Sequence, residues 1–380
     1  MIRSARLQKT PGPTPLHDAE HVSAHANMWR IIGDFWDSWP QLEEHFSLFE
    51  QWVPRMRPGR WPDGDMLPLG RIGLRAEQGE PRMTHFTRDE QSTLMSLFLI
   101  CRSPLMFGGN LPDNDQFTLN LISNEEALSV LQKSRNNRLL VDDGERIIWV
   151  ADDAGSSDTY VALFCVDRRP IVESKAVWSS KSLTCKAGEQ SDRVKANIRG
   201  ARKLYLVVAP GPDNNDWDHA DWIEPKLIGR NDTLSLTGIT WVSATSGWST
   251  ARVGRSVGGN ALTVDNTVYA DGIGTHATSV IEYDIPQGYD TFSAIVGLDK
   301  ECVDHIEGAT VKFLLFTEYP TGSAPADSIT ISLTAEQLGV KGTWRVRDLW
   351  GRKDLGELGN GISLSVRSHG SRLLRIREAK

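Results

Sequence analysis

Two short stretches near the start of the chain combine tryptophans with acidic residues. The first, WRIIGDFWDSW, runs from Trp29 to Trp39, and the second, RWPDGDML, runs from Arg60 to Leu67. Indole faces stack on pyranose rings, while carboxylates hold sugar hydroxyls and transfer protons. On one strand, residues 30, 32 and 34 share a face, so Arg30 and Asp34 point the same way. The stretches indicate a sugar site.

Together the two stretches resemble the second half of the catalytic barrel of glycoside hydrolase family 27, the α-galactosidase family. In that family, Trp-Arg-x-x-x-Asp on the sixth barrel strand carries the general acid/base, and Trp-x-Asp-x-Asp-Met-Leu on the seventh lines the pocket. The resemblance implies that Asp34 is the acid/base and that Arg30 binds substrate. It also assigns four further substrate-binding residues, namely Trp29, Asp63, Asp65 and Met66. From spacing alone, an ion-pair network of Arg30, Asp34 and Asp37 is the alternative.

A retaining glycosidase of this kind needs two carboxyl groups about 5–5.5 Å apart, and the second is harder to find. The family's nucleophile is an Asp in a Lys-x-Asp strand upstream of the matched stretches. Here only Asp18 and Glu20 precede Trp29, in a stretch typical of a surface helix. We therefore expect the nucleophile to be absent, the chain to be truncated at its N-terminus, and the chain alone to be inactive. If it is active alone, Asp37 or Asp65 must take that role.

The loop at Thr10 bears on which sugar is accepted. In many α-galactosidases an acidic residue in this loop contacts the C2 substituent of the sugar, whereas a small residue leaves room for a larger group. An α-N-acetylgalactosaminidase or a β-L-arabinopyranosidase relative is therefore the alternative activity. The expected substrates are galactose-containing oligo- or polysaccharides.

The pattern of apolar residues predicts α/β structure followed by all-β structure. Residues 1–135 alternate short apolar runs with helical periods, as expected of a partial (second-half) (β/α)8 barrel. Thr87-x-x-Glu90 and Ser123-x-x-Glu126 are capping boxes that begin helices. Residues 136–172 and 326–380 predict an antiparallel β-sandwich domain. There, Asp348-Leu349-Trp350 resembles a strand of the family's C-terminal β-domain.

Between these parts, residues 173–325 resemble the novel putative carbohydrate-binding module, NPCBM. The resemblance rests on Gly272-Ile273-Gly274-Thr275-His276-Ala277, Gly247-Trp248 and Asp218-His219-Ala220-Asp221-Trp222. In the NPCBM family the Asp-His-Ala-Asp-Trp stretch follows the other two motifs, whereas in this chain it precedes them. This order predicts a circularly permuted β-sandwich that is inserted into the β-domain. Trp248 and Trp222 are candidate stacking residues, and His276 is a candidate hydrogen-bonding residue. The alternative is that these motifs are structural, with Asp218, Asp221 and Asp299 around a calcium ion.

Composition narrows the classes of partner. A formal charge of −7 does not favour nucleic acid or an anionic membrane, and no apolar run is long enough to span a bilayer. The basic residues after Met1 have no following apolar stretch, so they predict no signal peptide, although full-length relatives are commonly secreted or periplasmic. The four scattered cysteines (Cys101, Cys165, Cys185 and Cys302) predict buried thiols. We expect no cofactor apart from the possible calcium ion.

Two further readings compete with the truncated enzyme. One is a carbohydrate-binding protein without catalysis, which uses the module and the remnant pocket. The other is a half-barrel subunit that pairs with a separate N-terminal half-barrel chain.

Overall fold

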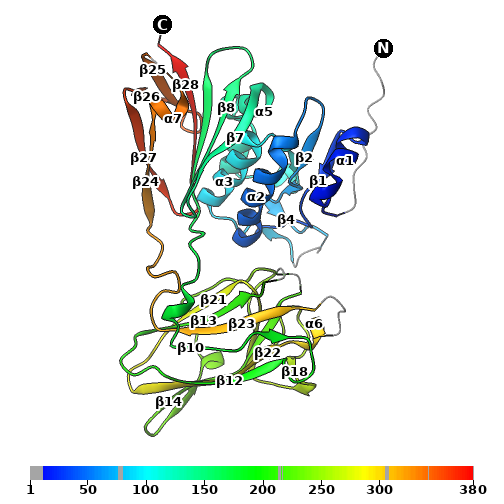
Figure 1. Ribbon diagram of the computed structural model, residues 1–380, viewed down its shortest axis with the longest axis vertical. Helices are drawn as coiled ribbons and strands as arrows, with labels where there is room; N and C mark the ends of the chain where they lie inside the picture. The colour runs from blue at the N-terminus through cyan, green and yellow to red at the C-terminus, as the bar shows by residue number, and fades with distance from the viewer. Residues whose placement is uncertain are drawn as a thin grey trace. The chain divides into compact units, whose positions relative to one another are not determined.

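The protein, represented by a computed structural model, consists of two compact units (Figure 1). Unit 1 comprises residues 1–169 and 325–380, and unit 2 comprises residues 170–324, compared with the predicted insertion at 173–325. The structure describes residues 12–75, 80–212, 215, 217–303, 308–340 and 342–379. The predicted specificity loop at Thr10 and the residues that follow Met1 lie outside the described residues.

The first part of unit 1 alternates short strands with helices. Its elements, in chain order, are η1 Leu16–Asp18, α1 Ala19–His25, β1 Met28–Arg30, α2 Trp39–Trp52, η2 Val53–Arg55, β2 Trp61–Asp63, β3 Met66–Leu67, β4 Arg71–Ile72, β5 Arg82–Met83, α3 Arg88–Ile100, β6 Met106–Phe107, η3 Leu111–Asp113, α4 Gln116–Ile122 and α5 Glu125–Lys133. Strand β1 pairs in parallel with β2, and β3 pairs in parallel with β6. Parallel strands joined through helices are the units of which α/β barrels are built.

Local sequence signals account for these helices. One face of α2 is buried, as its spacing predicts, through Leu42, His45, Phe46 and Phe49. The predicted capping box at Thr87 and Glu90 begins α3, and both of its hydrogen bonds are present. The predicted box at Ser123 is wrong. Helix α5 is capped by Asn124, whose side chain accepts the backbone N–H of Ala127.

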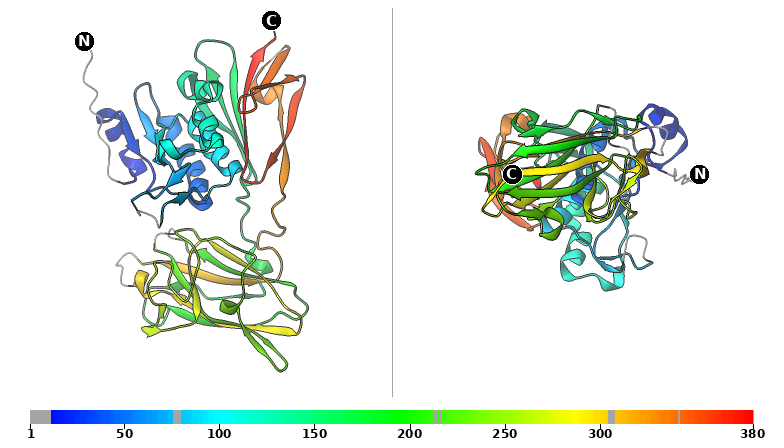
Figure 2. Two further views of the ribbon diagram at one scale, coloured as in Figure 1. Left: turned by 180° about the vertical axis from the view of Figure 1, so that it is seen from behind. Right: turned by 90° about the horizontal axis from the view of Figure 1, so that it is seen from below.

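The second part of unit 1 is antiparallel. Its elements are β7 Ser134–Asp142, β8 Arg146–Asp153, β9 Thr159–Cys165, β24 Ser328–Thr334, α7 Ala335–Leu338, β25 Trp344–Asp348, β26 Lys353–Glu357, β27 Gly361–Arg367 and β28 Ser371–Glu378. Six strands form one sheet in the order β26-β25-β28-β9-β8-β7, and β24 pairs with β27. The red strand β28 lies in the same sheet as the green strands β7 and β8, and it pairs directly with β9 (Figures 1 and 2).

This sheet is buried on both faces, which explains its continuous apolar runs. Along β8, Ile147 and Trp149 join the core that contains the helices of unit 1. Ile148 and Val150, on the opposite face, pack with Ile331 and other residues of β24 and β27. Alternating side chains of one strand thus serve two cores.

Unit 2 is a β-sandwich of two six-stranded sheets. Its elements are η4 Glu173–Lys175, β10 Trp178–Ser179, β11 Leu183–Thr184, β12 Ser191–Asn197, β13 Lys203–Pro210, β14 His219–Gly229, β15 Thr233–Ser235, η5 Leu236–Gly238, β16 Ser243–Ala244, β17 Arg252–Val253, β18 Thr263–Val264, β19 Thr267–Val268, β20 Gly272–His276, β21 Ser279–Asp284, β22 Tyr289–Leu298, α6 Lys300–Val303 and β23 Thr310–Phe316. One sheet follows the order β10-β23-β13-β21-β16 with β11 on β23, and the other follows β12-β22-β14-β20-β17 with β15 on β14. Side chains such as Leu206 and Phe292 fill one core.

Among the described residues, no helix is both long enough and apolar enough to cross a membrane.

Candidate functional site

Arg30, predicted to bind substrate, is the last residue of β1 and the centre of the first candidate site. We call this the Arg30 site and define it as Arg30, Asp34, Asp63 and Asp65. Parallel pairing sets Arg30 beside Asp63, the last residue of β2. In barrel enzymes, active sites form where parallel strands end at their carboxyl side. The Arg30 site therefore lies where that architecture places chemistry.

The guanidinium of Arg30 is held in one orientation. Arg30 is only 7% exposed. Its Nη1 donates to Oδ1 of Asp34 at 3.0 Å, and its Nη2 donates to the carbonyl of Ile32 at 3.0 Å. The same Nη2 lies 3.5 Å from Oδ2 of Asp65. Because a buried charge needs partners, these carboxylates fix the cation and are fixed by it.

Asp34 differs from the other carboxylates of the two stretches because it projects into solvent. Its side chain is 84% exposed, although one oxygen contacts Arg30. Asp37, in contrast, is 7% exposed, receives Nη2 of Arg82 at 2.9 Å, and accepts the backbone N–H of His85 at 2.6 Å. Asp34 is thus placed to give a proton to a group that arrives from solvent, whereas Asp37 is fully engaged.

Asp63 and Asp65 together form the turn beneath the site. Asp63 is 1% exposed, and its Oδ1 accepts the backbone N–H of Asp65 at 3.0 Å. This bond supports Asp65 at a positive φ of 74°. Oδ2 of Asp65 accepts the backbone N–H of Phe35 at 3.0 Å, which ties the turn to the segment after Asp34. The buried carboxylate of Asp63, a predicted substrate-binding residue, therefore shapes the turn in this structure, and its contact with substrate stays a prediction.

The structure also corrects the role of Trp29. Its side chain is 1% exposed and packs against Trp52 of α2, with ring centroids 5.9 Å apart. Neighbouring residues of a strand face opposite sides, so a site on the side of Arg30 excludes Trp29. Met66 remains half-buried in β3, beside the parallel strand β6.

A second candidate site lies in unit 2, around His219. We call it the His219 site and define it as Trp217, His219, Trp248, His276 and Glu301. The His219 ring stacks with two indoles, with centroid distances of 5.5 Å to Trp217 and 5.3 Å to Trp248. Both tryptophans are 43% exposed. Two half-exposed indoles around an imidazole form an apolar, aromatic surface of the kind on which sugar rings stack.

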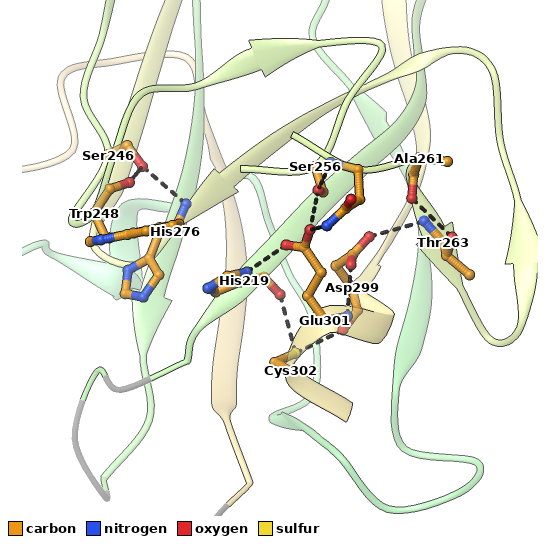
Figure 3. Close-up of polar contacts among 11 residues, drawn as sticks. His219, Ser246, Trp248, Ser256, Ala261, Thr263, His276, Asp299, Glu301 and Cys302 are labelled. Carbon is orange, nitrogen blue, oxygen red and sulfur yellow. Dashed lines mark hydrogen bonds and ion pairs between the residues drawn. The ribbon is translucent and has the colours of Figure 1, made fainter. Parts of the chain in front are cut away.

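Glu301 adds a carboxylate to this surface (Figure 3). Its Oε2 lies 2.7 Å from Nδ1 of His219, while its Oε1 accepts hydrogen bonds from Ser256 at 2.7 Å and from Asn260 at 2.5 Å. Burial alone would raise the pKa of Glu301, but the bonds from Ser256, His219 and Asn260 outweigh it and lower that pKa. Glu301 is therefore an anionic acceptor, suited to sugar hydroxyl groups.

His276 and Trp248, both candidate binding residues, lie close together, with ring centroids 6.2 Å apart. His276 is only 6% exposed, and its Nδ1 lies 2.6 Å from the carbonyl of Ala277. Burial lowers the pKa of His276 to about 4, so its imidazole is neutral at pH 7. Ser246 fixes the Trp248 loop, because its hydroxyl donates to the Trp248 carbonyl at 2.7 Å and accepts the His276 N–H at 3.1 Å.

Trp222, the other predicted stacking residue, cannot reach a ligand. It is 0% exposed and lies edge-on to Phe313, 5.0 Å away, between the two sheets. The prediction missed Trp217, His219 and Glu301. His219 lay within the quoted Asp-His-Ala-Asp-Trp motif, but Glu301 is 82 residues away from it and no local spacing links the two.

Of the carboxylates considered for calcium, Asp299 is engaged by backbone N–H groups. Asp299 accepts the backbone N–H groups of Glu301 at 2.8 Å and Thr263 at 2.9 Å. Asp221 is fully buried beside Asp299, and burial followed by the Asp299 charge raises its pKa well above the usual range. Within the parts of the chain that the structure describes, no group of three or more His, Cys, Asp and Glu side chains is arranged to hold a metal ion.

Three family models match successive parts of the chain. Residues 8–133 match the family model described as alpha galactosidase A. Residues 312–376 match the alpha galactosidase C-terminal beta sandwich domain. Residues 150–228 and 232–336 match the NPCBM/NEW2 domain. The matched families combine a TIM barrel with a β-sandwich, and the described strands and helices fit that combination.

Individual relatives cover parts of the chain. Alpha-galactosidase 2 from Arabidopsis thaliana is 25% identical over 199 residues, which are 48% of this chain and 46% of the relative. Alpha-N-acetylgalactosaminidase from Gallus gallus is 35% identical over 82 residues, 20% of each chain. A family 27 β-L-arabinopyranosidase from Geobacillus stearothermophilus has a TM-score of 0.54 at 24% identity, covering 98% of this chain and 50% of that one. The chain thus spans about half the length of these larger relatives or less.

Proposed function

Because the chain belongs to glycoside hydrolase family 27, the α-galactosidase family, and carries an NPCBM module, we propose that it is the acid/base-bearing part of a retaining glycosidase for terminal α-galactosides. In this proposal, the α/β part of unit 1 is the second half of a (β/α)8 barrel. Unit 2 is an inserted carbohydrate-binding module.

One observation carries the catalytic proposal, namely the exposed carboxylate of Asp34 held by the buried Arg30 at the end of β1. Asp34 protonates the leaving oxygen of the glycoside and then removes a proton from the water that attacks the glycosyl-enzyme. This chemistry needs carboxylates and water, and no cofactor.

The nucleophile is the second requirement of this mechanism. Asp37 is bound by Arg82, and Asp65 is engaged by Arg30 and by the backbone of Phe35. Neither carboxylate is free to attack an anomeric carbon. We therefore assign the nucleophile to the first half of the barrel, supplied by another polypeptide segment.

The test is reconstitution. The chain is mixed with a polypeptide that carries the first half of a family 27 barrel, and hydrolysis of aryl α-galactoside is measured. We expect turnover only in the mixture, loss with Asp34→Asn, and full retention with Glu20→Gln, which removes an exposed carboxylate upstream of the site. Ordinary turnover by the chain alone would show that a carboxylate of this chain is the nucleophile.

The same assay separates the possible activities. The Gallus gallus relative is an alpha-N-acetylgalactosaminidase and the solved Geobacillus structure is a β-L-arabinopyranosidase. Aryl α-N-acetylgalactosaminide and aryl β-L-arabinopyranoside are therefore compared with aryl α-galactoside in parallel. The proposal requires the α-galactoside to have the highest kcat/KM.

A second candidate function is carbohydrate binding without catalysis, and the exposed indoles of the His219 site favour it. Affinity electrophoresis of the full chain through a galactan-containing gel measures it directly. We expect retardation that Trp248→Ala removes and Val268→Ala leaves intact, because Val268 is an exposed apolar residue of unit 2 outside the site. Equal mobility with and without galactan would exclude this function for galactan.

A further inference from the structure

Two cysteines that are far apart in the sequence meet in unit 2. Cys185 follows β11 and Cys302 lies in α6, 117 positions later. The neighbouring Cys185 thiol is the first cause that raises the pKa of the Cys302 thiol. Cys185 Sγ also lies 3.8 Å from the carbonyl oxygen of Cys302, and it accepts the backbone N–H of Ala309 at 3.2 Å. The fold itself therefore brings these two cysteines together.

The other two cysteines provide a contrast. Cys101 is the buried C-cap of α3, and Cys165 ends β9 in unit 1. Burial is the cause that raises the pKa of Cys101, and no thiol contributes at Cys165. All four cysteines are free thiols in the structure. Three are buried as predicted, whereas Cys185 is only partly buried. Of the four cysteines, only Cys185 and Cys302 are neighbours of each other in the structure.

We propose that Cys185 and Cys302 form a structural disulfide when the chain folds in an oxidising compartment. Oxidised glutathione is a sufficient oxidant. The Cys185 thiolate attacks one glutathione sulfur and releases one glutathione. The Cys302 thiolate then attacks the Cys185 sulfur and releases the second. Two protein thiols are oxidised, and one glutathione disulfide is reduced to two thiols.

The surroundings of the pair indicate when the bond forms. Cys185 is partly exposed, whereas Cys302 is 0% exposed. The Cys302 thiol also donates to the carbonyl of Asp299 at 2.9 Å. The adjacent Cys185 thiol and burial both raise the pKa of Cys302 far above its usual range. Since only a thiolate attacks, the native thiols react slowly, and the bond belongs to the folding stage rather than to a rapid redox switch.

The bond would act on the His219 site through α6. Cys302 directly follows Glu301 in this helix of four residues, and Figure 3 shows Cys302 joined to the backbones of His219 and Asp299. A covalent link from α6 to the segment after β11 therefore restrains the helix that carries the carboxylate. This consequence adds to the proposed sugar binding, but formation of the bond does not depend on it.

The experiment compares the full chain made in bacteria with an oxidising cytoplasm and in ordinary, reducing bacteria. Free thiols are alkylated under denaturing conditions, and peptides are mapped by mass spectrometry. We expect two alkylated cysteines, Cys101 and Cys165, and a linked 185–302 peptide 2 Da lighter than its reduced parts. Reduction should lower the Tm of unit 2 by on the order of 10 °C, since the bond closes a long loop.

Two variants serve as controls for the assignment of the disulfide. Cys101→Ala/Cys165→Ala should keep both the linked peptide and the reduction-sensitive Tm, and Cys185→Ser should lose both. The partly exposed Cys185 is the member of the pair whose change least disturbs the core. Four alkylated cysteines in natively folded protein from the oxidising cells would overturn the proposal. So would a bond to Cys101 or Cys165, or dimers linked through Cys185.

Discussion

Glu43, on α2, gives a test of the unit 1 packing that does not depend on any activity. Burial raises the pKa of Glu43 from 4.5 to about 7, against the opposing positive charges of Arg168 and His369. The carboxyl group therefore lies between α2 and segments adjoining β9 and β28. A change at Glu43 reports on how closely the helix is held there.

The expected magnitude follows from linkage. A pKa that rises from 4.5 to about 7 corresponds to at most about 3 kcal/mol, at 1.36 kcal/mol per pH unit. The folded state keeps a proton that the unfolded state releases between these values. The contribution of the protonated Glu43 carboxyl group to the free energy of unfolding is therefore fully present below pH 4.5, and it is lost as pH rises through 7. Because the Glu43 side chain retains some exposure, we expect about half of this maximum.

Urea unfolding of the full chain at about pH 5 and about pH 8 measures this effect. Glu43→Gln is neutral at every pH, so it should stabilise unit 1 relative to wild type by roughly 1–2 kcal/mol more at pH 8 than at pH 5. Glu50→Gln, on the exposed face of the same helix, controls for loss of a charge. If Glu43→Gln changes the free energy of unfolding equally at both pH values, the carboxyl group is not held in a desolvated position.

Three further outcomes are expected. In the reconstituted enzyme, Asp34→Ala should lose at least 100-fold more activity on poor leaving groups than on activated aryl glycosides, since only the former need protonation, and azide should partly restore turnover. Trp248→Ala should abolish retardation in galactan gels while the Tm stays within about 2 °C of wild type, because the indole is half-exposed. Asp221→Asn should change stability less than Asp299→Ala, because burial raises the pKa of Asp221 and so favours the uncharged form that Asn resembles. Asp299→Ala should cost about 2–4 kcal/mol by removing the acceptor of two partly buried backbone N–H groups, and thermal unfolding of both variants checks this.

Short-range patterns made the Arg30 site predictable in part. Arg30 and Asp34 are four positions apart, so one strand end and one turn are enough to bring them together. The same local logic located the cap of α3 at Thr87. Alternation along β1 would also have excluded Trp29, since it is next to Arg30 and faces the other side of the strand. The family motif outweighed that geometric signal.

The His219 site was less predictable because it is assembled over long sequence distances. Composition does not distinguish a half-exposed indole such as Trp248 from a buried one such as Trp222. Only the sandwich, in which β14 pairs with both β20 and β22, decides which side of each strand is covered. Glu301 reaches His219 from a helix that follows β22, and no pattern within either segment requires the contact. Tertiary pairing, rather than local propensity, creates this site.

The insertion of unit 2 affects the loop-closure entropy of unit 1. Strands β9 and β28 pair in one sheet, although the whole of unit 2 lies between them in the sequence. An unfolded linker of about 155 residues would cost roughly 3 kcal/mol more to close than a short loop. Within unit 2, however, the backbone N–H of Val172 donates to the carbonyl of Pro320 at 2.9 Å, so the two ends of the module are adjacent. Once unit 2 has folded, it presents unit 1 with the equivalent of a short connection. The order in which the units fold therefore determines whether this closure entropy is lost before or during the pairing of β9 with β28. A module that folds first and is closed covalently near its core would remove that cost before β28 reaches β9.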